Sequence, residues 1–181
     1  MIRYLIILYA MVLLGCQLQR ISPDESLKKL GSNPYFVLDN QPVAITEIEA
    51  IAEKDIAAIT TYHGKDATSR FGKIARDGAV VIETTAYAID KFEILFSNKS
   101  AEYRELIGEV SHEEIRYVLN GTPLLKGYEG LFASLTRKSL RNIEVVDSLQ
   151  LQDLYPTSYK KAGVLIRSRV PKNIDRSDAN F

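Results

Sequence analysis

Two stretches of the chain share one pattern: Phe36-Val37-Leu38-Asp39-Asn40-Gln41-Pro42-Val43 and Tyr117-Val118-Leu119-Asn120-Gly121-Thr122-Pro123-Leu124. Each opens with the aromatic and β-branched residues that are typical of a strand. Asp39-Asn40 and Asn120-Gly121 then supply residues that tolerate the positive φ of a tight turn. Each stretch therefore predicts a strand, a two-residue turn and a returning extended segment.

A second set of positions extends the likeness beyond these hairpins. The first stretch precedes the second by 117 − 36 = 81 residues, and later positions match at 143 − 59 = 84. The later matches pair Ile59, Phe71, Val80 and Ile82 with Ile143, Tyr155, Val164 and Ile166. The difference of three residues indicates a loop insertion near residues 127–130. The pattern predicts an internal duplication; the alternative is that two unrelated strand-turn-helix-strand units look alike because such units share the same physics.

Local patterns predict the remaining elements. Strands are expected at 35–38, 56–62, 79–85 and 91–96, and helices at 66–74 and 100–108. Asp66 or Thr68 is the expected N-cap of the first helix. Ser111 and Glu114 fit the capping box of a further helix. Val80, Ile82, Val164 and Ile166 lie in short apolar runs and are predicted to be core.

The N-terminus has the order of a secretory signal peptide. Arg3 precedes an apolar run at 4–14, and Gly15-Cys16 follows it. A membrane-spanning helix needs about 20 apolar residues. The apolar run here has 11, so it is too short to be one. A buried strand would not explain why Arg3, Gly15 and Cys16 stand where they do. The run ending at Cys16 resembles the lipobox of bacterial lipoproteins, which implies removal of residues 1–15 and acylation of Cys16.

Composition narrows the function classes. Without residues 1–15 the chain keeps 22 of its 23 basic residues and all 23 acidic ones, so its net charge is −1. This balance argues against a nucleic-acid surface and against binding anionic lipid by charge. Cys16 is the only cysteine, which excludes an intramolecular disulfide and a thiolate metal site.

Residues 34–85 resemble the plug domain of TonB-dependent receptors of the Bacteroidetes type. The pieces that match are 35–43, Ile56-Ala57-Ala58-Ile59, Lys65-Asp66-Ala67-Thr68, Phe71-Gly72 and 78–85, and a fainter copy covers about 115–170. Residues 60–64 make one loop two residues longer than the family has. Only 96 residues follow Thr85, too few for a transmembrane barrel. The resemblance implies a small α+β fold and protein binding, not a receptor.

These observations together predict an α+β protein made of two plug-like strand-turn-strand-helix-strand repeats packed together. The expected parts are a signal peptide (1–15), a lipidated tether (16–32), repeat 1 (33–88), a connecting strand and helix (89–114), repeat 2 (115–171) and a polar tail (172–181).

No catalytic or metal constellation is expected, and no cofactor. His63 and His112 are the only histidines, and they lie 49 residues apart, whereas a metal site typically gathers three or four ligands. Asp39, Asn40, Asn120 and Gly121 are turn residues and candidate contacts. The side chains of Asp39 and Asn120 are expected to satisfy backbone groups of their turns.

The function expected first is a non-catalytic outer-membrane lipoprotein that acts through contact with another envelope protein. The alternative is a lipoprotein that holds a small ligand between the two repeats, and an enzyme ranks third. Residues 17–20 lack the acidic pair that is expected of a signal for export to the cell surface. The periplasmic face of the outer membrane is therefore favoured. Exposed sheet edges would support the first function, and a deep apolar cleft between the repeats would support the second.

Overall fold

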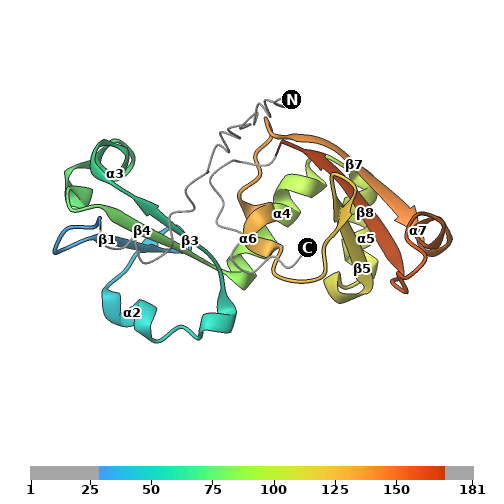
Figure 1. The fold of residues 1–181 in the computed structure, drawn as a ribbon, viewed down its shortest axis with the longest axis horizontal. Helices are drawn as coiled ribbons and strands as arrows, with labels where there is room; N and C mark the ends of the chain where they lie inside the picture. The colour runs from blue at the N-terminus through green and yellow to red at the C-terminus, as the bar shows by residue number, and fades with distance from the viewer. Residues whose placement is uncertain (1–28, 170–181) are drawn as a thin grey trace, which may run out of the picture.

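The structure is a computed structural model, and it describes residues 29–169 (Figure 1). The predicted signal peptide, Cys16, the tether up to residue 28 and the polar tail (172–181) lie outside the described residues. Within residues 29–169, no helix combines the length and the apolar character needed to cross a membrane.

Two four-stranded sheets form the body of the molecule, and their strand orders correspond (Figure 1). The first has the order β2-β1-β4-β3 and the second β6-β5-β8-β7. In each sheet the two central strands are parallel and the outer pairs are antiparallel. The strands are β1 (Tyr35–Leu38), β2 (Gln41–Pro42), β3 (Ile56–Tyr62), β4 (Ala79–Thr84), β5 (Ile115–Leu119), β6 (Thr122–Pro123), β7 (Leu140–Asp147) and β8 (Ala162–Ser168).

The residues that the two sequence offsets align also occupy corresponding register positions. Phe36 pairs with Val80 and Tyr117 with Val164, while Ile59 pairs with Ile82 and Ile143 with Ile166. The mixed α+β class is thus confirmed. The evolutionary claim of a duplication stays a prediction.

Six α-helices and three 3-10 helices connect the strands in the described part of the chain. They are α2 (Ile45–Glu49), α3 (Gly64–Phe71), α4 (Thr85–Ser97), α5 (Ala101–Glu109), α6 (Glu129–Ala133), α7 (Ser148–Leu154), η1 (Glu53–Asp55), η2 (Gly72–Ala75) and η3 (His112–Glu114).

The predicted helix 66–74 is divided in two, and its predicted N-cap is wrong. α3 begins at Gly64 with His63 as its N-cap and ends at Phe71, where η2 takes over. The Thr68 hydroxyl donates to the carbonyls of Gly64 and Lys65, one turn earlier, so it does not cap the helix.

The predicted connecting strand at 91–96 is wrong, because these residues belong to α4. Thr84 ends β4 and caps the helix, since its hydroxyl oxygen accepts a hydrogen bond from the Tyr87 N–H at 3.2 Å. Phe92 and Phe96 lie one turn apart and are buried, whereas Ile94 between them is 65% exposed. The alternation of apolar residues therefore arose because Phe92 and Phe96 share the buried face of a helix and the exposed Ile94 happens to lie between them.

The helix predicted at 100–108 is confirmed as α5, with Ser100 as its N-cap accepting from the Tyr103 N–H. The helix expected after Ser111 is only the single turn η3. It stops there because Ile115 starts the buried strand β5.

The main hydrophobic core lies in the second half of the molecule. α4, α5 and α6 pack against one face of the second sheet, and the buried aromatic side chains there are Phe92, Phe96, Tyr103, Tyr117 and Phe132. The first half has a smaller cluster, made of Ala67 in α3, Ala75 in η2 and Ala79 in β4. The four residues predicted to be core, Val80, Ile82, Val164 and Ile166, are all buried.

Helices α4 and α6 lie between the two sheets (Figure 1). At Gly130, α6 approaches β3 so closely that a Cβ atom would lie 2.2 Å from the carbonyl oxygen of Ala57. The two halves therefore meet in direct backbone contact at the start of β3.

Candidate interaction surfaces

The two predicted hairpin turns have the same backbone geometry. Asp39 and Asn40 have φ of 48° and 66°, and Asn120 and Gly121 have φ of 51° and 87°. Positive φ at both central residues is the requirement of a tight hairpin turn that matches strand twist. The side-chain choice at these positions is therefore explained locally.

Asp39 and Asn120 are the first of the two central residues in their turns, and their side chains reach beyond those turns. The Asp39 carboxylate accepts from the N–H of Thr84 at 2.7 Å and from its hydroxyl at 2.8 Å. Asn120 accepts from the Ser168 N–H at 3.0 Å and donates to the Ser168 carbonyl at 2.9 Å. Asp39 and Asn120 thus fasten each hairpin to the end of the neighbouring central strand. The groups they satisfy belong to β4 and β8, not to the turns as expected.

Strand β3 forms an open edge of the first sheet. Its seven residues, Ile56–Tyr62, carry no charge, and within the described chain no strand pairs with its outer side. α6 covers the start of β3 at Ala57, while Ile59 and Thr60 are exposed. An uncharged edge of this kind is a template for pairing with another strand.

The corresponding edge strand β7 is protected. Arg141, Glu144 and Asp147 interrupt its apolar residues, and charged side chains are a common means of discouraging edge pairing. Ile143 is 8% exposed because helices pack over it, whereas its counterpart Ile59 is 56% exposed. The two edges occupy equivalent places in their sheets and differ in their capacity to accept a partner.

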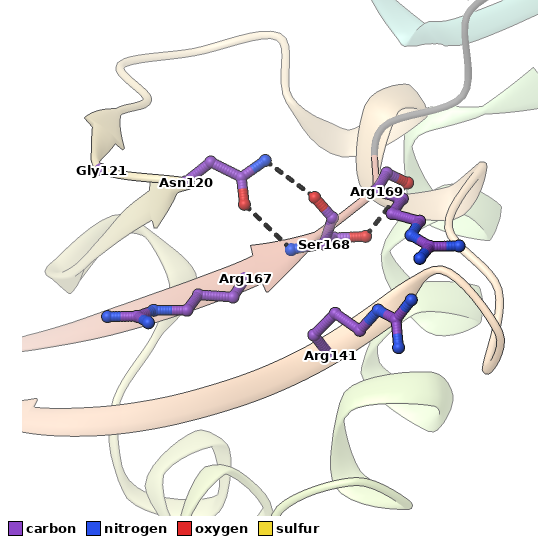
Figure 2. A pocket seen from close by; sticks show the side chains of 6 residues that line it. All are labelled: Asn120, Gly121, Arg141, Arg167, Ser168 and Arg169. Carbon is purple, nitrogen blue, oxygen red and sulfur yellow. Dashed lines mark hydrogen bonds between the residues drawn. The ribbon is translucent and has the colours of Figure 1, made fainter.

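An open depression of about 510 Å³ lies at one end of the second sheet (Figure 2). The hairpin turn contributes Asn120 and Gly121 to its lining. β7 and the end of β8 contribute Arg141, Arg167, Ser168 and Arg169. Among residues 29–169, none of these arginines forms a salt bridge.

The arginine side chains do not converge on one point. In Figure 2 the guanidinium groups of Arg141 and Arg169 lie on the same side, while Arg167 points the other way along the sheet. This arrangement suits a spread of carboxylates across a surface better than a single enclosed anion. Guanidinium groups bind carboxylates through paired hydrogen bonds.

A chain of hydrogen bonds runs into the main core from α4. Glu93 contacts Nε2 of His112, whose Nδ1 lies 2.6 Å from the Tyr117 hydroxyl. That hydroxyl lies 3.3 Å from the hydroxyl of Tyr103. Burial raises the pKa of Tyr117 and of Tyr103, and both side chains are fully buried. The order carboxylate, imidazole, hydroxyl resembles a nucleophile with its base, but no substrate can reach these hydroxyls.

The two histidines occupy different halves of the molecule. His63 stands at the N-cap position of α3 without a side-chain capping bond, and its Nδ1 has no hydrogen-bond partner among residues 29–169. His112 belongs to the core network. In that part of the chain no three metal-ligating side chains gather at one place.

Sequence reasoning missed the arginines of the depression. Arg167 and Arg169 stand two apart, a spacing that places them on one face of an extended segment. That signal was present, but Arg141 joins them only through the pairing of β7 with β8.

Comparison with family models, with curated proteins and with solved structures finds no match for this chain.

Proposed function

We propose that this protein is a non-catalytic lipoprotein of the outer membrane, anchored through an acylated Cys16, that acts through protein–protein contact in the cell envelope. The order of Arg3, the apolar run and Cys16 supports the anchor. More than one acyl chain holds a protein stably at a bilayer. The body then faces the periplasm, where it binds another envelope protein.

The observation that carries this proposal is the open edge of β3. It offers backbone donors and acceptors together with exposed Ile59 and Thr60, and it has no charged residue to discourage pairing. Strand addition to such an edge supplies affinity from main-chain hydrogen bonds and specificity from alternate side chains. We infer that a partner contributes an extended strand beside residues 58–62.

We also infer that the body is a duplicated, plug-like unit. Starting residues of matching elements support this: β6 follows β2 by 122 − 41 = 81, and β7 follows β3 by 140 − 56 = 84. The helices α6 and α7 follow α2 and α3 by 129 − 45 = 84 and 148 − 64 = 84. The three extra residues then fall between β6 and α6, at 124–128. The plug resemblance adds to this a tendency to bind other proteins.

The competing functions have less support. A small ligand held between the repeats would need space where α6 meets β3, and Gly130 packs directly against Ala57 there. An enzyme would need a reachable nucleophile, and the carboxylate–imidazole–hydroxyl order ends in buried tyrosines.

A photo-activatable amino acid at Thr60, introduced into the full chain in its native envelope, tests the proposal. We expect a crosslinked product whose added mass is that of another envelope protein. Glu144 is the matched control, because 60 + 84 = 144 places it at the equivalent position of the protected edge. Ile59→Lys, with the photo-activatable residue kept at position 60, should then remove the product, since an edge lysine opposes strand addition.

Equal crosslinking from Thr60 and Glu144, or no product from Thr60 in intact cells, would contradict strand addition at β3. Persistence of the crosslinked product in a folded Ile59→Lys variant would contradict it too.

A further inference from the structure

One end of the second sheet carries five exposed cations. Arg137 and Lys138 lie in the turn that precedes β7, and Arg141, Arg167 and Arg169 follow on β7 and at the end of β8. A backbone hydrogen bond of 3.0 Å from Arg169 to Ser139 brings the two groups together. None of the five forms a salt bridge within residues 29–169. We refer to these five residues as the basic end.

The first half carries the opposite charge before its own edge strand. Residues 45–55 hold four exposed acids, Glu47, Glu49, Glu53 and Asp55, and one base, Lys54, for a net charge of −3. No salt bridge in the described chain involves these acids. We refer to residues 45–55 as the acidic stretch.

The two surfaces occupy matching places in the fold. η1 (Glu53–Asp55) directly precedes β3, and residues 137–139, which are 84 positions later, directly precede β7. Corresponding surfaces of the two sheets thus carry opposite charge.

The basic end and the acidic stretch do not meet within one molecule. In Figure 1, α2 lies on the lower side of the molecule and the start of β7 on the upper side. No ion pair within residues 29–169 joins the two surfaces. Each is therefore available to a second molecule.

We propose that the basic end of one molecule binds the acidic stretch of a second copy of this chain. Arginine forks recognise carboxylates, and the depression between Arg141, Arg167 and Arg169 gives the acids room to enter. The net charge of the mature chain is −1, so overall repulsion between copies is small. The contact joins unlike surfaces, so each added copy leaves one of each free and the assembly grows as a row or closes as a ring.

Sedimentation of the full-length protein in a non-ionic detergent tests this contact. We expect association at about 50 mM salt that is lost at about 500 mM, because salt screens exposed charges. Arg141→Glu with Arg167→Glu should weaken association at least about tenfold, and so should Glu53→Lys with Asp55→Lys. Mixing the two reversed proteins should restore association. Lys99→Glu with Lys126→Glu lowers the net charge as much as the arginine reversal does, at exposed sites elsewhere, and should leave association unchanged.

Unchanged unfolding curves will show that the reversed variants fold. If the arginine-reversed variant does not fold, Arg141→Gln with Arg167→Gln replaces it in the same measurement. The proposal is overturned by a monomeric wild type at low salt, by association that ignores both reversals, or by a mixture that fails to associate. An envelope protein that needs Arg141 and Arg167 while the wild type stays monomeric would also overturn it. That last result would leave the proposal for β3 untouched.

Discussion

Gly130 lies where the two halves of the molecule pack against each other. Its missing side chain lets α6 lie against the backbone of β3, where a Cβ would come 2.2 Å from the carbonyl oxygen of Ala57 and 3.1 Å from the Ala58 Cβ. The obstacle is backbone, which cannot swing aside as the end of a side chain can. Gly108 in α5 is the opposite case, since no atom lies within 4 Å of its added Cβ.

We expect Gly130→Ala to lower the free energy of unfolding by about 1–3 kcal/mol, the usual cost of overpacking. Gly108→Ala should raise it by about 0.5–1 kcal/mol, because glycine is a poor residue inside a helix. Urea unfolding of both variants measures the difference. Equal effects from the two substitutions would mean that α6 does not press on β3.

The turn residues were predictable from sequence, but their partners were not. Asp39 and Asn120 fit the φ requirement of a hairpin, which is a local property. Their bonds to Thr84 and Ser168 cross 45 and 48 residues of sequence. Only the pairing of the central strands brings those groups together, so no local pattern could have revealed them.

At the scale of elements, strands were easier to predict than the helix α4. β3 has the predicted bounds because β-branched residues occupy four of its seven positions and Tyr62 ends it. In α4, Phe92 and Phe96 fit both a period of two and a helical turn of four. The Thr84 cap and the burial of Ala88 identify the helix, and both residues lie before the window 91–96 in which the alternation was found.

Ile59 and Ile143 test whether equivalent strands have equivalent surroundings. Ile143→Ala should cost about 2–5 kcal/mol in stability, because it empties a packed site in the main core. Ile59→Ala should cost no more than about 0.5 kcal/mol in the free protein, since surface substitutions usually stay within that range. Chemical denaturation of each variant measures both. A large loss for Ile59→Ala would mean that its face of β3 is covered.

Considered as a whole, the molecule repeats one topology with unequal contents. The two sheets share strand order and register, yet the large aromatic core belongs to the second alone. Opposite charges also lie at corresponding ends of the sheets. The shared topology was accessible from sequence because turn chemistry and spacing encode it. The inequality was not, because it depends on where α4, α5 and α6 pack.

Alkaline pH should destabilise the whole body through its buried tyrosines. Burial raises the pKa of Tyr128 to about 12, with the Glu129 charge adding to it, and burial also raises the pKa of Tyr103 and Tyr117. Unfolded tyrosine ionises near pH 10. The folded state keeps these protons longer, so this stabilising contribution is complete below about pH 10 and is lost as pH rises through the folded pKa values.

Free energies of unfolding measured from pH 8 to 12 should therefore fall above about pH 10. The fall should be shallower in Tyr117→Phe, which removes one of the three groups. Ultraviolet titration of the folded protein should show some of its 10 tyrosines ionising late. Ionisation of all of them together near the ordinary pKa would contradict the burial of this cluster.

The contact between α6 and β3 also sets an order of events during synthesis. A chain grows from its N-terminus, so β3 is complete about 70 residues before Gly130 exists. Until then the first sheet lacks the helix whose Gly130 packs against Ala57. The first half therefore reaches its final packing only once α6 has been made.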